Sequence, residues 1–384
     1  MRATSSRAVA LIVVVAATLM ACTSEGIPGV DYDQAKPFVL SGVENLTEIA
    51  QLTGPGAMND TQAAAVAGTD LGSMVNLGDV TYFLFGDTFG ERDPESYGGQ
   101  GAIWRSNVAA YTTDSDPSDG ITFDGWRPVD DLGWATALVE GDHDANTGAG
   151  EVTKIPTGGF AVDGALYVNF MSVSFWGEPG AWDANFAGLA RSDDQGATWT
   201  RLEQPQWPGD SNFIQISAAH VEDPDGEHIY FWCIPSGRFG GVQLMRVPAT
   251  RTAVESSAAY SYFSGVGADG SPRWSQDASD AETIVEPTVG ELSVMWSEYL
   301  DRWIMTYSDA GSAYIREGIT PWGPWGDALE LVPGSEYPGL YSPYLNPRYV
   351  SEDGRRVYFT LSLWGPYNVF WFSADLVAAG RDKN

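Results

Sequence analysis

Short β-rich segments recur along the chain after residue 45, and Gly, Asp, Asn or Pro bounds each one. Aromatic and β-branched residues dominate five of them, at 80–85, 165–170, 228–234, 303–307 and 357–361. These residue types favour strands, and the flanking residues favour turns. No long segment repeats apolar residues with the 3.6-residue period of an amphipathic helix, so we expect few and short helices.

The spacing of these segments indicates a repeated architecture. They are roughly fifty to ninety residues apart, which leaves room for a small sheet in each repeat. Alternating partner segments lie between them, for example 187–191 followed by 198–202. Four-stranded sheets repeated around an axis form a β-propeller. We therefore predict an all-β fold, a single five-bladed β-propeller over residues 45–384.

One hairpin supports the propeller independently. Residues 192–199, Ser-Asp-Asp-Gln-Gly-Ala-Thr-Trp, match an Asp-box. In this motif a carboxylate closes the hairpin loop, a glycine takes an unusual backbone angle and a tryptophan plugs the blade. Asp194, Gly196 and Trp199 would fill these roles. Asp-boxes lie on the propeller rim, so we expect a structural role here and not a catalytic one.

The N-terminal segment has the pattern of an export signal. Arg2 and Arg7 precede an apolar run that ends in Leu19-Met20-Ala21-Cys22. A basic start, a short apolar stretch and small residues before a cysteine are typical of a lipoprotein signal peptide. We predict a signal peptide over 1–21, lipidation of Cys22 and a tether over 22–44. The protein would then be lipid-anchored at the cell surface or periplasmic face. The alternative is a secreted protein in which Cys22 is an incidental thiol.

Charge and composition narrow the possible partners. The chain has 51 acidic and 20 basic residues and a formal charge of −31. Such a chain repels phosphate backbones and anionic lipid, so we expect no nucleic-acid binding and membrane contact only through the anchor. We expect a monomer. Beyond Cys22, Cys233 is the remaining cysteine, and its aromatic neighbours indicate a packed core thiol.

Metal chemistry is not favoured by the histidine pattern. The three histidines, His143, His220 and His228, lack the spacing of a helical zinc motif. Residues 140–146 alternate oxygen ligands that could bind calcium, although without EF-hand spacing, and a solvated loop is the alternative. We predict no metal and no organic cofactor.

Candidate chemistry is concentrated near the start of the fold. Asp60, Asp70 and Asp87 lie in three glycine-bearing turns, and Asp70 and Asp87 flank the segment 80–85. The innermost strand of each blade lines the central channel of a propeller, so Asp70 and Asp87 can reach one mouth of it. Paired carboxylates cleave glycosidic bonds, one as acid and the other as nucleophile or base. The alternative is that these aspartates only stabilise their own turns.

The same turns carry a resemblance to a known family. Gly68-Thr69-Asp70-Leu71-Gly72 and Phe85-Gly86-Asp87-Thr88-Phe89-Gly90 resemble the opening motif of the domain of unknown function 4185 family. Further similarity lies at 53–61, 235–240, 289–294 and 299–307. That family is similar to, and includes, glycoside hydrolase family 183, whose members are five-bladed endo-D-arabinofuranases acting on the D-arabinan of mycobacterial arabinogalactan and lipoarabinomannan. The resemblance implies this activity, Asp70 as nucleophile, Asp87 as acid/base and a retaining outcome.

Other side chains are candidates for substrate binding. Asp60 lies in the first of the turns described above. Glu291 begins a strand-like run and would be a third channel acid or a hairpin residue. Arg238 would hold a carboxylate or sugar hydroxyls, or form a salt bridge between blades. Glu151 and Glu286 could each replace one aspartate as the acid.

Aromatic residues in turn-rich stretches are candidate sugar platforms. These are Trp176, Trp182, Trp364 and Tyr367. Their faces can pack against the C–H side of furanose rings. Two hypotheses remain: an exported endo-D-arabinofuranase, or a non-catalytic glycan-binding propeller lipoprotein with the same groove.

Overall fold

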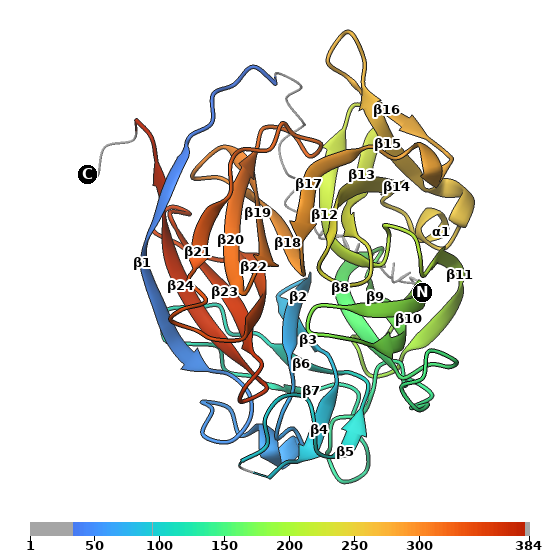
Figure 1. The fold of residues 1–384 in the computed structure, drawn as a ribbon, viewed down its shortest axis with the longest axis vertical. Coiled ribbons are helices and arrows are strands. Elements are labelled where there is room, and N and C mark those ends of the chain that lie inside the picture. The colour runs from blue at the N-terminus through green and yellow to red at the C-terminus, as the bar shows by residue number, and fades with distance from the viewer. Residues whose placement is uncertain (1–33, 94, 381–384) are drawn as a thin grey trace, which may run out of the picture.

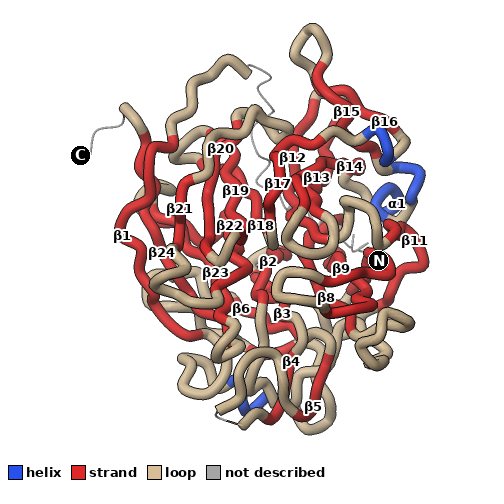
Figure 2. Tube along the Cα trace, viewed as in Figure 1, coloured by secondary structure: helices blue, strands red, loops and turns tan. Residues whose placement is uncertain are grey.

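The computed structural model describes residues 34–93 and 95–380. The predicted signal peptide and Cys22 lie outside these residues. Regular structure is almost entirely β-strand (Figure 2). The helices are short, as predicted: α1 (Arg251–Val254), η1 (Thr61–Ala64), η2 (Ser257–Ala259) and η3 (Ala278–Asp280). No helix among the described residues has the length and apolar character needed to cross a bilayer.

Five blades radiate from a common centre (Figure 1), which confirms the predicted propeller. Blade 1 comprises β2 (Leu71–Leu77), β3 (Val80–Phe85), β6 (Val108–Thr112) and β7 (Gly125–Trp126). The hairpin β4 (Thr88–Glu91) and β5 (Ala102–Arg105) is inserted between β3 and β6. Blade 2 comprises β8 (Thr153–Val162), β9 (Ala165–Trp176), β10 (Trp182–Ser192) and β11 (Thr200–Pro208).

Blade 3 is the most elaborate blade. It comprises β12 (Gln215–Asp223), β13 (Gly226–Ile234), β14 (Gly240–Pro248), β15 (Ser261–Val266), β16 (Pro272–Ser275) and β17 (Thr283–Val289). Both β15 and β17 pair with β14. Blade 4 comprises β18 (Leu292–Ser297), β19 (Arg302–Asp309), β20 (Ser312–Gly318) and β21 (Leu329–Val332). Blade 5 comprises β22 (Leu340–Ser351), β23 (Arg356–Leu363), β24 (Asn368–Ala378) and β1 (Leu40–Gln51).

The five segments predicted as strands are the second strands of the five blades. They lie in β3, β9, β13, β19 and β23. A second strand is hydrogen-bonded along both edges, and it is covered on both faces by neighbouring blades. It therefore carries the most continuous apolar run of its blade. In β13, for example, every residue from 228 to 234 is buried.

The ring closes through the N-terminal strand. The inner strands β2, β8, β12, β18 and β22 contact one another in cyclic order. The outermost strand of blade 5 is β1, which pairs antiparallel with β24 from Leu40↔Ala378 to Gln51↔Phe370. Residues 40–44, which the sequence pattern assigned to the tether, therefore belong to the propeller. One blade thus joins the N-terminal and C-terminal ends of the described chain.

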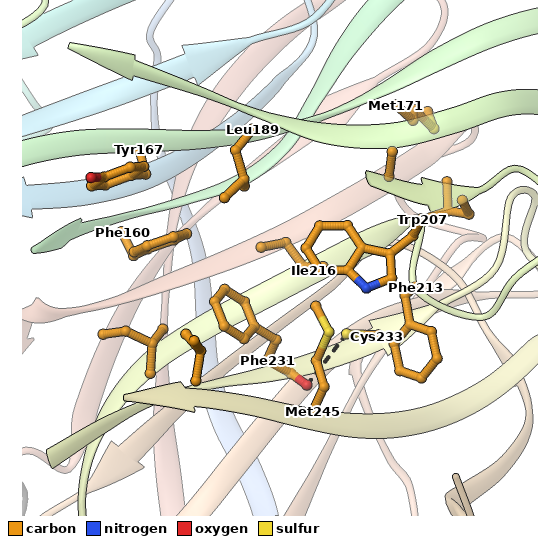
Figure 3. Close-up of a cluster of buried hydrophobic side chains, with 14 of the residues drawn as sticks. Phe160, Tyr167, Met171, Leu189, Trp207, Phe213, Ile216, Phe231, Cys233 and Met245 are labelled. Carbon is orange, nitrogen blue, oxygen red and sulfur yellow. Dashed lines mark hydrogen bonds between the residues drawn. The ribbon is translucent and has the colours of Figure 1, made fainter. Parts of the chain in front are cut away.

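Aromatic packing between blades 2 and 3 forms the largest apolar cluster (Figure 3). The rings of Phe160 and Tyr167 stack with centroids 5.2 Å apart, and Phe231 meets Phe160 edge-on. Cys233 is fully buried in this cluster, and its thiol donates to the carbonyl of Phe231. Burial raises the pKa of the Cys233 thiol well above its ordinary value. The prediction of a packed core thiol is confirmed.

The Asp-box between β10 and β11 has the predicted roles. Both carboxylate oxygens of Asp194 accept hydrogen bonds from Thr198, one from the backbone N–H and one from the hydroxyl. Gly196 has φ +85°, a conformation that side-chain-bearing residues rarely adopt. The indole N–H of Trp199 donates to the carbonyl of Gly196. The motif stabilises the hairpin turn between β10 and β11.

Candidate active site

The inner strands bring three predicted residues, and also Tyr341, to one face of the propeller. Asp70 immediately precedes β2, Glu151 lies two residues before β8, Glu291 immediately precedes β18, and Tyr341 is the second residue of β22. Because all inner strands run in the same direction, these residues lie where the central channel opens. We call this opening the upper face. These residues are far apart in sequence because each belongs to a different blade, and the closed ring brings them to the same opening.

Unusual backbone presents Asp70 to the channel. Leu71 and Gly72 have φ +68° and +86°, and the β2–β3 ladder shifts register between Leu71 and Ser73. A positive φ at a leucine is uncommon and marks a bulge that redirects the chain. Gly86 lies directly beside the carboxyl, because a Cβ at this position would be 2.4 Å from Asp70 Oδ1. Glycine at residue 86 therefore makes room for Asp70.

The Asp70 carboxyl is partly exposed and has mixed contacts. The hydroxyl of Tyr341 donates to Asp70 Oδ2 at 2.9 Å, and the Tyr367 hydroxyl also lies near this carboxyl. Oδ1 is buried and accepts no hydrogen bond from the described residues. Burial raises the pKa of Asp70 from 3.8 to about 7, while the Tyr341 hydroxyl partly offsets the rise. Asp70 is thus a carboxyl that changes charge near neutral pH.

Asp87 is placed by three different elements. It follows β3, and its Oδ1 accepts hydrogen bonds from the Trp104 indole at 2.7 Å and the Thr153 hydroxyl at 2.6 Å. Burial raises the pKa of Asp87 from 3.8 to about 7, and these two hydrogen bonds oppose the rise. The charge of His143 also lowers this pKa, and that of Glu140 raises it.

Asp70 and Asp87 lie next to each other. Phe85 pairs with Leu71, so the end of β3 adjoins the start of β2. The hydroxyls of Thr69 and Thr88, which neighbour the two aspartates in sequence, are 2.6 Å apart. The charge of Asp87 contributes to the raised pKa of Asp70. Burial raises the pKa of Tyr367, and the charges of both aspartates raise it further. The structure therefore brings the two sequence-predicted acids together at one mouth of the channel.

Arg238 and Glu291 form an ion pair between two neighbouring blades. The Arg238 guanidinium donates to both oxygens of Glu291, at 2.6 to 3.0 Å, and joins blade 3 to blade 4. It also lies over the rings of Tyr341 and Trp182, with its central carbon 5.1 and 5.6 Å from their centroids. The charge of Glu291 raises the pKa of Arg238 and is one cause of the raised pKa of Asp70. The structure shows the interblade salt bridge expected as one alternative for Arg238, and a role of Arg238 in substrate binding stays a prediction.

The sequence profile of a family described as "Domain of unknown function (DUF4185)" matches residues 56–373. The protein belongs to the DUF4185 family. The match begins before Asp70 and ends within β24, so it covers the acid pair and most of the propeller.

Other proteins resemble this DUF4185 protein in sequence or fold. "Notoamide biosynthesis cluster protein J'" of Aspergillus versicolor is 28% identical over 313 residues, which cover 78% of this chain and 81% of that protein. A crystal structure of a "putative hydrolase" from Bacteroides ovatus aligns with TM-score 0.52 and 16% identity over 80% of this chain and 86% of the other. A GH43_1 enzyme of Xanthomonas citri aligns with TM-score 0.47 and 13% identity over 86% and 92%.

Glu151 lies at the upper face but belongs to a different polar cluster. It is buried, forms an ion pair with Lys154 and accepts hydrogen bonds from the Ser172 hydroxyl and the Asp142 backbone N–H. A cavity of about 330 Å³ opens beside it, and neither Asp70 nor Asp87 lines this cavity. Its pairing with Lys154 favours a structural role for Glu151 over that of catalytic acid.

Asp60 and Glu286 do not join the acid pair in the described structure. Asp60 is exposed at the start of η1, and Glu286 is exposed on β17. None of the hydrogen bonds that the described residues make to Asp70 or Asp87 comes from these two regions.

The acidic loop 140–146 is held by protein contacts. His143 and Glu140 are in contact at 2.6 Å, and the His143 ring meets the Trp104 ring edge-on at 4.0 Å. Among the described residues, the cluster that best resembles a metal-ligand set lies elsewhere, at Asp223, Asp225 and His228. Arg246 already bridges its two aspartates, which supplies the positive charge that a cation would bring.

The aromatic candidates lie on two sides of the acids. Trp364 is 43% exposed, and its ring centroid is 6.5 Å from that of Tyr341 and 5.6 Å from that of Tyr367. Trp176 packs on Trp182, which lies below Arg238. Tyr341, Trp104 and Thr153, which contact the acids directly, had no sequence signal of their own. Their motifs are ordinary strand sequences, and only the closed ring brings them to the site.

Proposed function

We propose that this DUF4185 protein is an endo-acting glycoside hydrolase that cleaves D-arabinofuranosyl linkages in mycobacterial-type arabinan. The observation that carries the proposal is the pair Asp70 and Asp87. Two adjacent, half-buried carboxyls with raised pKa values at the mouth of a propeller channel are the equipment that glycosidic cleavage requires.

The two carboxyls can divide the chemistry between them. When two neighbouring acids both have pKa values near 7, the form with one proton on the pair is well populated near neutral pH. Asp87 donates its proton to the leaving glycosidic oxygen while Asp70 attacks the anomeric carbon and forms a glycosyl ester. Asp87 then takes a proton from water, which attacks the same carbon and releases Asp70. This is the retaining scheme.

The contacts of each acid support this order. Asp70 accepts a hydrogen bond from Tyr341, and its charge interacts favourably with Arg238, so its ionised form has two stabilising neighbours. Its Oδ1 is buried and accepts no hydrogen bond from the described residues, so attack on the substrate carbon would fall to Oδ2, the oxygen that Tyr341 contacts. Both donors to Asp87 bond its Oδ1, which leaves Oδ2 to carry the transferred proton.

The substrate class rests on the resemblance and on charge. The motifs around Asp70 and Asp87 resemble those of family 183 endo-D-arabinofuranases, and a neutral arabinan suits a chain with a formal charge of −31. The name of the Bacteroides ovatus protein agrees with a hydrolase. We further propose export and anchoring through Cys22, from the sequence of residues 1–22.

The test is incubation of the purified protein with arabinogalactan and lipoarabinomannan, followed by analysis of released oligosaccharides. We expect release by the wild type and at least about a 100-fold lower rate for Asp70→Asn and Asp87→Asn. Asp79→Asn is the matched control, because Asp79 is exposed in the turn at the opposite end of the same β2–β3 hairpin. It should retain full activity.

Two outcomes would overturn the proposal. One is the absence of any product from wild-type protein that melts cooperatively. The other is undiminished release by both aspartate variants. Saturable binding of arabinan that stays intact on long incubation would instead favour the non-catalytic glycan-binding protein.

A further inference from the structure

Three strongly exposed aromatic side chains lie around the acid pair. Tyr97 is 69% exposed, Phe239 is 58% exposed and Trp364 is 43% exposed. Each stands on a loop at the upper face: Tyr97 between β4 and β5, Phe239 between β13 and β14, and Trp364 between β23 and β24. Large apolar side chains that stay in water at a channel mouth are typical of ligand contact.

Tyr97 and Trp364 form one side of this arrangement. A Cβ at Gly365 would lie 3.3 Å from the Tyr97 ring, and a Cβ at Gly98 would lie 2.5 Å from the Trp364 ring. The two loops therefore pack against each other. Trp364 in turn touches Tyr341 and Tyr367, which lie beside Asp70.

Arg92 holds these two loops in place. It donates to the carbonyls of Gly98 and Pro366, one from each loop. Its guanidinium also lies 5.5 Å from the centroid of the Tyr367 ring. Rings on braced loops need little further ordering when a ligand binds.

Phe239 forms the opposite side. It directly follows Arg238, whose backbone N–H donates to the carbonyl of Gly180 in the turn between β9 and β10. Gln215 donates to the carbonyls of Pro235 and Gly237, which braces the same loop from the inner strand β12. Phe239 is therefore an exposed ring on a loop that is fixed at three points.

Asp70 lies between these two sides. The Trp364 ring contacts the Tyr341 ring, and the Arg238 guanidinium also lies over the Tyr341 ring, with Phe239 next to Arg238 in sequence. Asp70 accepts a hydrogen bond from Tyr341. Trp364 belongs to blade 5 and Phe239 to blade 3, so the two platforms approach the channel from different blades.

We infer that Tyr97 and Trp364 bind sugar units on one side of the scissile bond and that Phe239 binds a unit on the other. The ligand would be a neutral glycan of several sugar units that crosses the upper face from blade 5 to blade 3. This inference rests on the proposed function and deepens it, since platforms on both sides of the acids explain cleavage within a chain. The aromatic faces would pack on the C–H faces of the sugars.

The experiment compares long and short substrates with Tyr97→Ala, Phe239→Ala and the double variant. The long substrate is arabinan, and the short one is a chromogenic aryl D-arabinofuranoside that reaches only the acids. Loss of one stacked ring should raise KM for arabinan about tenfold, while kcat/KM for the short substrate stays unchanged. Phe38→Ala is the control, because Phe38 is also an exposed aromatic (47%) but lies on the rim near Gly326.

Unchanged KM for arabinan in the double variant would overturn the inference, and so would an equal loss on both substrates. Arabinan affinity measured with each ring variant in an Asp70→Asn background separates this inference from the proposed function. If the wild type cleaves nothing but the ring variants bind arabinan more weakly, the enzyme assignment fails and the platforms stand. If cleavage is normal and neither ring matters for binding, the platforms fail and the enzyme assignment stands.

Discussion

At the scale of the residue, the two aspartates tie the stability of the protein to pH. Their folded-state pKa values near 7 lie above the unfolded value of 3.8. The folded state therefore holds protons that the unfolded chain has lost between these pH values. The contribution of each carboxyl to stability is fully present below about pH 4 and is lost as pH rises through 7.

Replacing either carboxyl with an amide removes the group whose ionisation lowers the stability of the fold as pH rises. We expect Asp70→Asn and Asp87→Asn to melt higher than the wild type at pH 8, by about 1–2 °C for each kcal/mol regained. The advantage should disappear at pH 3, where the carboxyls are mostly neutral in both states. Thermal unfolding followed by circular dichroism at both pH values measures this. A shift of the same size at both pH values would contradict the linkage.

Tyr341 should set the pH at which Asp70 becomes active. Its hydroxyl lowers the pKa of Asp70 by donating a hydrogen bond to the ionised carboxyl. Tyr341→Phe removes this donor, so the acidic limb of the pH–rate profile should move to higher pH, by about one unit. Tyr349→Phe is the control, because the Tyr349 hydroxyl donates to the carbonyl of Asp114 and not to an acid of the site. An unshifted acidic limb in Tyr341→Phe would contradict this role.

At the scale of the element, some strands are much easier to predict than others. The second strands are covered on all sides, so 229–234 is a continuous apolar run and its strand is evident from sequence. The strand β1 pairs along one edge only, and its sequence, LSGVENLTEIAQ, is largely polar and half-buried or exposed. Its apolar signal is therefore weak, and the predicted boundary at residue 45 divided it between tether and propeller.

The same reasoning applies to the candidate site. Asp70 and Asp87 lie on one hairpin, so local sequence is enough to predict that they meet. Tyr341 is 271 residues from Asp70 along the chain, and only the closed ring makes them neighbours. Sequence therefore predicted that the two aspartates meet and named Glu291 as a further channel acid, but it gave no signal for Tyr341, Trp104 or Thr153, whose hydrogen bonds lower the pKa values of the pair.

Because β1 completes blade 5, its removal should damage the fold. Deletion through residue 51 would uncover the β24 edge along Phe370–Ala378 and leave its backbone groups without partners. We expect an aggregated protein without a cooperative thermal transition, as judged by size-exclusion chromatography and circular dichroism. A matched deletion through residue 33 should keep the transition. Equal behaviour of the two deletions would contradict the assignment of β1 as the closing strand.

At the scale of the whole molecule, the excess of acidic residues should make stability depend on salt. A formal charge of −31 repels itself in the compact state, and the Debye length falls from about 30 Å at 0.01 M to about 10 Å at 0.1 M salt. We expect the melting temperature at pH 7.5 to rise over this range of sodium chloride. A melting temperature that is flat or falls with added salt would show that favourable ion pairs, and not net repulsion, dominate the surface.

The closing strand has a further consequence for how this molecule comes into being. Asp70 and Asp87 belong to the first blade, whereas Tyr341 and the partner of β1 belong to the last. A growing chain therefore carries both acids for most of its synthesis without the hydroxyl that tunes one of them. Both the Asp70–Tyr341 hydrogen bond and the β1–β24 pairing need blade 5, so neither can form before the last strands of the chain have been made.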